Sequence, residues 1–330
     1  MTETVAAQTR QSAAVSWLRF VARRLAGVAA VLMVLVVLTF GMIQLIPGDP
    51  ARAVAGQDAS PAQIAEIRRQ LGLDQSLFAR FGDYVSGLLH GNLGTSFQTG
   101  EQVSQIVADR LVFTVELALP AVLIVLLVAV PLGMVVAIAT HNGRRRPLDN
   151  GFTVATSVAG AIPEYIVGTA LVLVFAVLLG LLPAAGAASG AALILPVLAV
   201  ALGPSCTLAR IVRRETTAVL GTDYSRTARG RRLPPLRRYA RHALPNLLTS
   251  TLTIGGLLLA HLLGGTVVVE TVFAWPGLGS KVVEAIAQRD YPVIQGIVLV
   301  LGAIAAVLNL FVDVALGFLD PRTLTGKAQS

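Results

Sequence analysis

The sequence predicts an all-α membrane protein with six transmembrane helices and an external helical insertion between the first two. Three observations predict this fold. The 330 residues are 55% apolar and only 13% charged, whereas about a quarter of the residues in globular domains are charged. Long apolar runs recur, each close to the ~20 residues that a helix needs to cross a bilayer. Arginine clusters flank these runs, and short loops rich in Lys and Arg stay in the cytoplasm.

The chain is expected to begin with a cytoplasmic tail at 1–24 and a first transmembrane helix at 25–46. The tail is too long and too polar to open a cleavable signal peptide, and the apolar run after it is too long for one. Three arginines at the end of the tail hold the start of this helix in the cytoplasm; they are Arg19, Arg23 and Arg24.

An external segment is expected at 47–112. Ser60, Pro61 and Gln63 match a capping box with proline at the first helical position, and Gly72 closes that helix. Apolar residues at helical spacing in 77–89 indicate a second, amphipathic helix. The segment is interpreted as a lid or receptor platform, or equally as a spacer.

The remaining segments alternate in the same way between apolar runs and polar or basic loops. The predicted order is a second span at 113–140, a third at 153–182, a fourth at 191–212, a cytoplasmic loop at 213–246, a fifth span at 247–269, an external loop at 270–291, a sixth span at 292–316 and a cytoplasmic tail at 317–330. Both termini then lie in the cytoplasm, which agrees with every arginine cluster.

The predicted cytoplasmic loop shows helix-forming segments, which a basic loop that only fixes the orientation of the chain in the membrane does not need. Residues 224–230 and 236–244 each favour a short helix, and Pro234-Pro235 separates them because proline cannot continue a helix. Two short helices joined by a sharp break would form a compact projection that a soluble partner can bind. The alternative, a solvated basic loop that only fixes orientation, remains open.

Five ionisable or polar residues lie at or near membrane depth, where ionisable groups are functional candidates; they are Glu116, Glu164, His261, Asn309 and Asp313. Glu164 follows Pro163 between glycines and is the best candidate for lining a pore. Asn309 and Asp313 are four residues apart, so they share a helix face. For these two, hydrogen bonds that hold the helix bundle together are favoured over a place in the translocation path.

Sequence signatures of enzymes are missing. The chain has no G-x-x-x-x-G-K-[ST], no H-E-x-x-H and no G-x-S-x-G. Its one cysteine excludes a cysteine metal cluster. The net charge of +8 lies mostly on arginines between apolar runs, which argues against nucleic-acid binding. We therefore expect a non-catalytic membrane protein with no metal site, driven by an ion gradient or by a separate ATPase.

A series of ordered motifs makes the chain resemble the first permease subunit of bacterial ABC importers of the dipeptide, oligopeptide and nickel class. The resemblance covers residues 25–322. Its motifs are Ile46-Pro47-Gly48-Asp49-Pro50, Leu71-Gly72-Leu73-Asp74-Gln75, Gly91-Asn92-Leu93-Gly94-Thr95-Ser96-Phe97, Thr114-Val115-Glu116-Leu117-Ala118, Glu270-Thr271-Val272-Phe273-Ala274-Trp275-Pro276-Gly277-Leu278-Gly279, Arg289-Asp290-Tyr291-Pro292, Asn309-Leu310-Phe311-Val312-Asp313 and Leu319-Asp320-Pro321-Arg322.

In such permeases the cytoplasmic projection is a coupling helix that docks on the ATPase. Arg226-Thr227-Ala228 and His242-Ala243-Leu244-Pro245 match the motif of this helix, whereas Arg232 stands where the family has glycine. Arginine tolerates a positive-φ turn poorly. The residues implied in docking are Tyr224, Arg226, Thr227, Ala228, Arg229, Gly230, Arg231, Arg232 and Leu233.

The resemblance implies a set of partners in a bacterial cell (inner) membrane. They are a homologous second permease, two ATPase subunits or domains that bind ATP and Mg, an external solute-binding protein and the lipid bilayer; this chain itself needs no cofactor. The expected cargo is di- or oligopeptides, with nickel chelates or glutathione-like solutes as alternatives. A stand-alone gradient-driven transporter is the rival interpretation, but it calls for intramembrane ion sites and internal repeats. A membrane hydrolase lacks a nucleophile–base pair.

Overall fold

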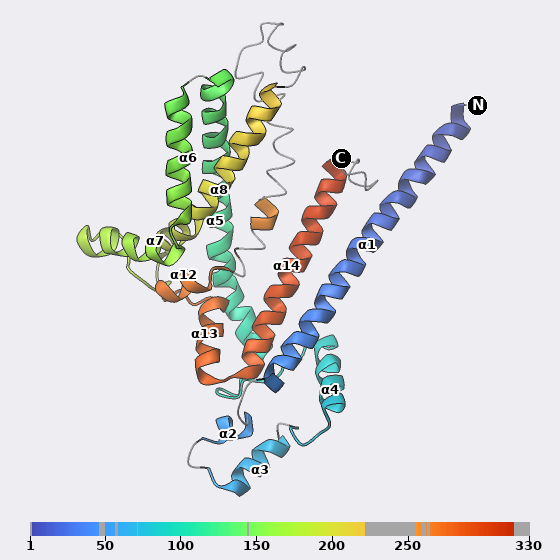
Figure 1. Cartoon of the computed structure of the whole chain (residues 1–330). Coiled ribbons are helices and arrows are strands. Elements are labelled where there is room, and N and C mark those ends of the chain that lie inside the picture. Colours follow the sequence, from blue (N-terminus) through green and yellow to red (C-terminus); the bar gives the residue numbers. More distant parts are fainter. Residues whose placement is uncertain are drawn as a thin grey trace.

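The computed structural model describes residues 2–45, 50–56, 59–70, 72–143, 145–221, 255–258, 262 and 265–319. Helices joined by turns and loops make up these ranges, and the only β-type pairing there is one bridge between Thr95 and Gln102. Figure 1 shows a bundle of α5, α6 and α8 beside a pair formed by α1 and α14, with α2–α4 at one end of the molecule. The all-α class predicted from the sequence is confirmed.

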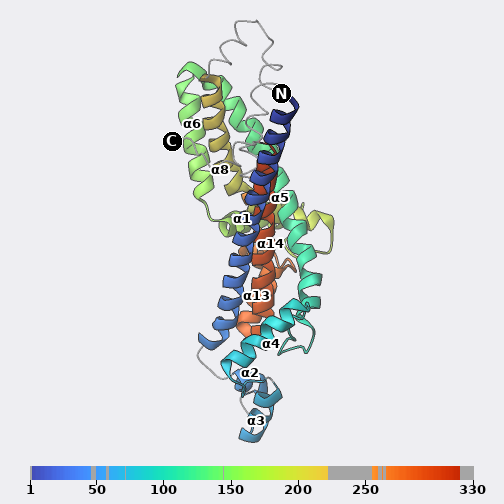
Figure 2. The ribbon, with the colours of Figure 1, turned by 90° about the vertical axis from the view of Figure 1, so that its right-hand side faces the viewer.

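The helices α1 (Thr2–Leu45) and α14 (Tyr291–Leu319) run side by side (Figures 1 and 2). They come close at Gly302, where a Cβ atom would lie 2.5 Å from Leu35 Cδ1. Helix α1 starts at residue 2, so the predicted tail 1–24 is helical. Its membrane-compatible part covers Trp17–Met42, and most of that part is exposed in the isolated chain.

The external insertion contains α2 (Pro50–Ala55), α3 (Pro61–Gln70) and α4 (Leu77–Leu89). The predicted capping box is present: Ser60 N–H donates to Gln63 Oε1 (2.8 Å), and Gln63 N–H donates to Ser60 Oγ (3.3 Å). Gly72 adopts φ +63° after α3, as expected for a helix-ending glycine.

Helix α4 is attached to α1 through two aromatic side chains. The Tyr84 hydroxyl lies 3.2 Å from Thr39 Oγ1, and the rings of Phe81 and Tyr84 both pack on Phe40. Burial in this contact raises the pKa of Tyr84, an effect that the hydrogen bond to Thr39 partly offsets. The insertion is therefore held at the C-terminal end of α1.

Two long helices, α5 (Val103–Thr140) and α8 (Ile194–Gly221), form the centre of the bundle. A Cβ on Gly133 of α5 would lie 2.5 Å from the carbonyl oxygen of Ala209, so only glycine permits this approach. Helix α5 begins at Val103, earlier than the predicted 113, because Val103 is fully buried in a second cluster of apolar residues with α13 and α14.

The third predicted span, 153–182, is not one straight helix. After the short η1 (His141–Gly143), helix α6 (Arg146–Ala161) ends and the chain turns by 89° into α7 (Glu164–Leu171), which continues as the π-helical η2 (Val172–Leu178). The cause is Pro163, which has no N–H to donate and holds Ile162 in an extended conformation (ψ 123°).

The predicted cytoplasmic loop 213–246 begins too early. After η3 (Gly190–Leu193), helix α8 continues past 212 to Gly221, because Thr216 and Leu220 on its last turns remain buried. The rest of this loop lies outside the described residues, as does most of the fifth predicted span, 247–269. The predicted external loop 270–291 contains the end of α12 (Val267–Val272) and α13 (Leu278–Gln288).

Four described helices are long and apolar enough to cross a membrane, and the bent pair of α6 with α7–η2 brings the number to five. The N-terminal end of α1, the turn before α6 and the last turns of α8 and α14 all lie at one end of the molecule (Figure 1). The chain is thus a multi-pass helical membrane protein.

Candidate functional site

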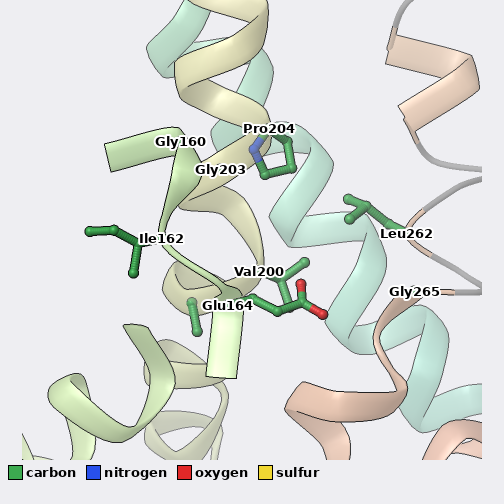
Figure 3. A pocket seen from close by; sticks show the side chains of 9 residues that line it. Gly160, Ile162, Glu164, Val200, Gly203, Pro204, Leu262 and Gly265 are labelled. Carbon is green, nitrogen blue, oxygen red and sulfur yellow. The ribbon is translucent and has the colours of Figure 1, made fainter. Parts of the chain in front are cut away.

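A cavity of about 330 Å³ lies at the bend between α6 and α7, against α8. Figure 3 shows the Glu164 side chain extending from the first turn of α7 toward the side on which Leu262 and Gly265 lie. The lining residues are Gly160, Ile162, Glu164, Ala199, Val200, Gly203, Pro204, Leu262 and Gly265. Glu164 is the only ionisable residue among them, so one carboxylate faces a space that apolar side chains and the backbone of several glycines otherwise line.

The cavity lies where both neighbouring helices carry a proline. Pro163 ends α6, and Pro204 lies inside the continuous helix α8, where it removes one backbone donor. A Cβ on Gly160 would lie 3.2 Å from Cys206 Cβ, whereas one on Gly203 would meet no atom within 4 Å. Gly160 therefore packs closely on α8, while the missing side chain of Gly203 leaves space beside Pro204.

The structure distributes the other predicted site residues over the rest of the chain. Asp313 forms an ion pair with Arg24 of α1 (2.7 Å), which agrees with a role in holding the bundle together. Asn309 is exposed on the same helix. The predicted docking residues at 224–233 lie outside the described residues. Of the predicted site residues that the structure describes, Glu164 alone lines the cavity.

Sequence reasoning missed a buried carboxylate in the segment that was predicted to be an external loop. Glu270 is fully buried. Its Oε1 accepts hydrogen bonds from the hydroxyls of Thr114 and Thr266, both at 2.9 Å, and its Oε2 accepts one from the backbone N–H of Ser280 at 3.0 Å. We call these four residues the Glu270 clasp; it joins α5, α12 and α13.

Glycines and a tryptophan close the Glu270 clasp. A Cβ on Gly277 would lie 2.3 Å from Glu270 Oε2, and one on Gly279 would lie 2.5 Å from the Cα of Val267, so neither position has room for a side chain. Trp275 Nε1 donates to the carbonyl of Phe113 (2.8 Å) and anchors the same turn on α5. The Trp-Pro-Gly-Leu-Gly run was the signal in the sequence for such a close approach.

A second buried acid joins two external segments. Asp290, 3% exposed, accepts hydrogen bonds from the Ser96 hydroxyl through Oδ2 and from the Phe97 backbone N–H through Oδ1 (3.0 Å). Gln98 Nε2 adds a bond to the carbonyl of Gln288 (2.9 Å). The N-terminal ends of α5 and α14 are therefore fixed to each other by side chains far apart in the sequence.

These features fit a passage for solutes better than a reaction centre. Among the described residues, no group of three or more His, Cys, Asp and Glu side chains is arranged to hold a metal ion. The side chains instead fix helix ends or face one cavity between helices. The fold defines a class: a multi-pass helical membrane protein with a cavity between its helices.

The family is shown by comparison with known proteins. The chain belongs to the binding-protein-dependent transport system inner membrane components: that family matches residues 129–325, and the N-terminal region of the same type of membrane component matches residues 17–118. The chain is therefore a permease subunit of an ABC importer, as the sequence motifs indicated.

Relatives match along nearly the whole length. A protein of Brucella abortus (strain 2308), named as a peptide transport system permease protein, is 37% identical over 308 residues, covering 91% of this chain and 97% of the relative. The glutathione transport system permease protein GsiC of Salmonella choleraesuis (strain SC-B67) is 38% identical over 305 residues, covering 92% and 98%. A solved structure of the MetNI methionine ABC transporter in inward-facing conformations shares the fold, with a TM-score of 0.50 and 15% identity over 68% of this chain and 97% of that one.

Proposed function

We propose that this chain forms, with a homologous second permease, the path by which a bacterial ABC importer takes up short peptides or peptide-like solutes such as glutathione. One observation carries the proposal: relatives named for peptide and for glutathione transport are each 37–38% identical to more than nine tenths of this chain. Both names denote cargo with amide bonds, a carboxylate and an amine.

The proposal includes the partners and orientation of the importer. Two ATPase subunits or domains bind ATP and Mg and dock on Tyr224–Leu233, and an external solute-binding protein delivers cargo to the end of the molecule that carries α2–α4. Both termini lie in the cytoplasm, at the end where Arg19, Arg23 and Arg24 meet the membrane. This chain acts without catalysing a reaction itself.

Within this path, Glu164 is the residue that contacts cargo. The Glu164 carboxylate is half-buried and lines the cavity, and a carboxylate attracts an opposite charge placed within a few ångströms of it. A peptide with a free ammonium group supplies such a charge, and the cavity of about 330 Å³ gives it room beside α7 and α8. The first-turn position of Glu164 also places the carboxylate at the positive end of the α7 dipole.

The test is ATP-dependent uptake into proteoliposomes that contain this chain, its second permease, the ATPases and the binding protein. We expect uptake of a labelled dipeptide or of glutathione, and Glu164→Gln should slow uptake of a free-amine peptide more than that of its N-acetylated form. The matched control is Thr169→Ala, on the exposed face of the same helix, which should leave both rates unchanged.

Two results would contradict this proposal. Uptake restricted to a nickel chelate, with none of any peptide, would assign a different cargo class. Equal rates for Glu164→Gln and the parent with both forms of the peptide would remove Glu164 from the path.

A further inference from the structure

Helix α8 leads without interruption from the cavity to the segment that precedes the proposed docking residues. Pro204 lies at the cavity, and the helix then continues to Gly221. Its last turns are packed rather than free, because Thr216 is fully buried and Leu220 is 4% exposed. A displacement at residue 221 is therefore passed along a packed helix toward the cavity.

Two arginines of this helix, one turn apart, bind α6 at two levels. Arg213 forms an ion pair with Asp149 in the first turn of α6. Arg210 donates from Nη1 to the backbone carbonyl of Thr156 (2.7 Å), further along α6. An acid in the first turn of a helix and a cation near its end both match the helix dipole. These contacts hold α6 against α8 over most of its length.

Each of the two helices has a proline at the level of the cavity, where α6 ends and α8 continues. Helix α6 stops at Ala161 before Pro163, and α8 contains Pro204 preceded by Gly203. Such sites absorb changes of backbone angle during domain motions, and proline breaks are the usual positions of helix kinks. Beyond these prolines, α6 and residues 205–221 pack as one unit.

Among the described residues, the ion pair between Arg213 and Asp149 leaves one hydrogen-bond donor of the arginine unpaired. Within the part of the chain that the structure describes, Arg213 Nη2 donates to Asp149 Oδ2 and is also in ion-pair contact with Oδ1, whereas the buried Arg213 Nε has no hydrogen-bond partner. Arginine and carboxylate often pair through two parallel hydrogen bonds. A shift between α6 and α8 that brought Nε to one of the two oxygens would add a second, parallel bond.

We infer that Arg210, Arg213 and Asp149 are positioning residues that make α6 and residues 205–221 of α8 one rigid unit, which carries the motion of the docking segment to the cavity. The inference rests on the proposed function, because it takes ATPase docking at Tyr224–Leu233 as the source of the motion. When the contacts are broken, α8 moves without α6, and ATP is hydrolysed without reshaping the wall that carries Gly160 and Glu164.

The experiment measures transported peptide per ATP hydrolysed in proteoliposomes that contain the complete importer. The variants are Asp149→Asn, Arg213→Gln and the charge exchange Asp149→Arg with Arg213→Asp. The matched control is Arg146→Gln, which removes a charge from the same first turn of α6 but at an exposed position. Co-purification of the ATPases with each variant is measured in parallel.

We expect the two single variants to retain the ATPases and their hydrolysis but to lower the transport-to-ATP ratio roughly five-fold or more, within the usual range of coupling between sites. The charge exchange should restore much of the ratio, which a general loss of folding would not permit. The control should match the parent. If the single variants do not assemble, the transport-to-ATP ratio is measured in Arg210→Gln, which removes hydrogen bonds rather than an ion pair.

An unchanged ratio in an assembled Asp149→Asn or Arg210→Gln complex would overturn the inference. Failure of the proposed function is seen separately: the parent complex then lacks bound ATPases, or Ala228→Glu in the docking segment leaves its transport-to-ATP ratio unchanged. In that case the source of motion is absent whatever the arginines do.

Discussion

Replacing Glu270 with alanine tests whether one buried carboxylate holds the external turn 273–280 on α5. The side chain is fully buried and accepts three hydrogen bonds, from Thr114, Thr266 and the Ser280 backbone. Thr114 Oγ1 in turn accepts a hydrogen bond from the Leu278 N–H at 2.8 Å. Alanine removes every acceptor that Glu270 provides while leaving the donors in place.

The size of the effect follows from those donors. A buried donor that loses its acceptor costs about 1–3 kcal/mol. The backbone N–H of Ser280 is fixed in direction and loses its acceptor. The hydroxyls of Thr114 and Thr266 both donate to Glu270 Oε1, so the substitution removes the acceptor of both. Including the space left by the side chain, we expect a loss of about 3 kcal/mol or more. Glu270→Gln retains one acceptor oxygen and should lose roughly half as much.

The assay is thermal unfolding of the purified chain with its second permease, at one fixed heating rate because membrane proteins often unfold irreversibly. A loss of about 3 kcal/mol corresponds to a fall of roughly 6 °C in the apparent midpoint, by extrapolation from domains of similar size. The control is Glu284→Ala on α13, whose exposed pair with Lys281 contributes at most about 1 kcal/mol. A midpoint for Glu270→Ala within about 2 °C of the control would refute the reasoning.

Two further predictions concern helix contacts. Gly133→Ala should lower the unfolding midpoint by an amount equivalent to about 1–3 kcal/mol, because its Cβ would meet the backbone of Ala209 at 2.5 Å. Gly151→Ala, whose Cβ would have no atom within 4 Å, should be neutral or slightly stabilising. Equal midpoints for the two variants would contradict the close approach of α5 and α8. Asp313→Ala should reduce the yield of assembled complex modestly and leave cargo preference unchanged, because its ion pair with Arg24 is partly exposed; normal yield with an altered cargo spectrum would place Asp313 in the path instead.

Local signals in the sequence were sufficient for the external helices. The capping box at Ser60 and Gln63 and the amphipathic run at 77–89 correspond to α3 and α4 within a residue at each end. Helix caps and hydrophobic spacing depend on neighbours within one turn, so a sequence records them directly.

Helix ends near the membrane surface were harder to predict. The predicted limits 113 and 212 mark where the apolar runs begin and end, but α5 and α8 extend beyond them to Val103 and Gly221. The length of an apolar run reflects the thickness of the bilayer that the helix crosses. The residue at which the helix ends depends instead on tertiary packing, such as the contact of Val103 with Gly296.

Glu270 shows why some of the buried contacts could not be predicted from the sequence. Its partners are 156, 4 and 10 residues away in the sequence, and an acid next to an apolar run is more often at a surface than buried. The sequence motif around Glu270 indicated the protein family, but it did not indicate which residues lie close to Glu270 in the fold. Glu164, by contrast, was found because a proline and two glycines marked an irregular helix around it.

The bonds from Asp290 to Ser96 and Phe97 also have a consequence for biogenesis. The partners are 194 and 193 residues apart, and ribosomes add about 5–20 residues per second. The two donors in the early segment are thus synthesised roughly 10–40 s before their acceptor. During this interval α4 can already pack on α1 through Tyr84 and Phe81, but Ser96 and Phe97 lack their partner. A chain that stops before residue 290 never forms this junction, so the connection between the two ends of the described fold is made only late in synthesis.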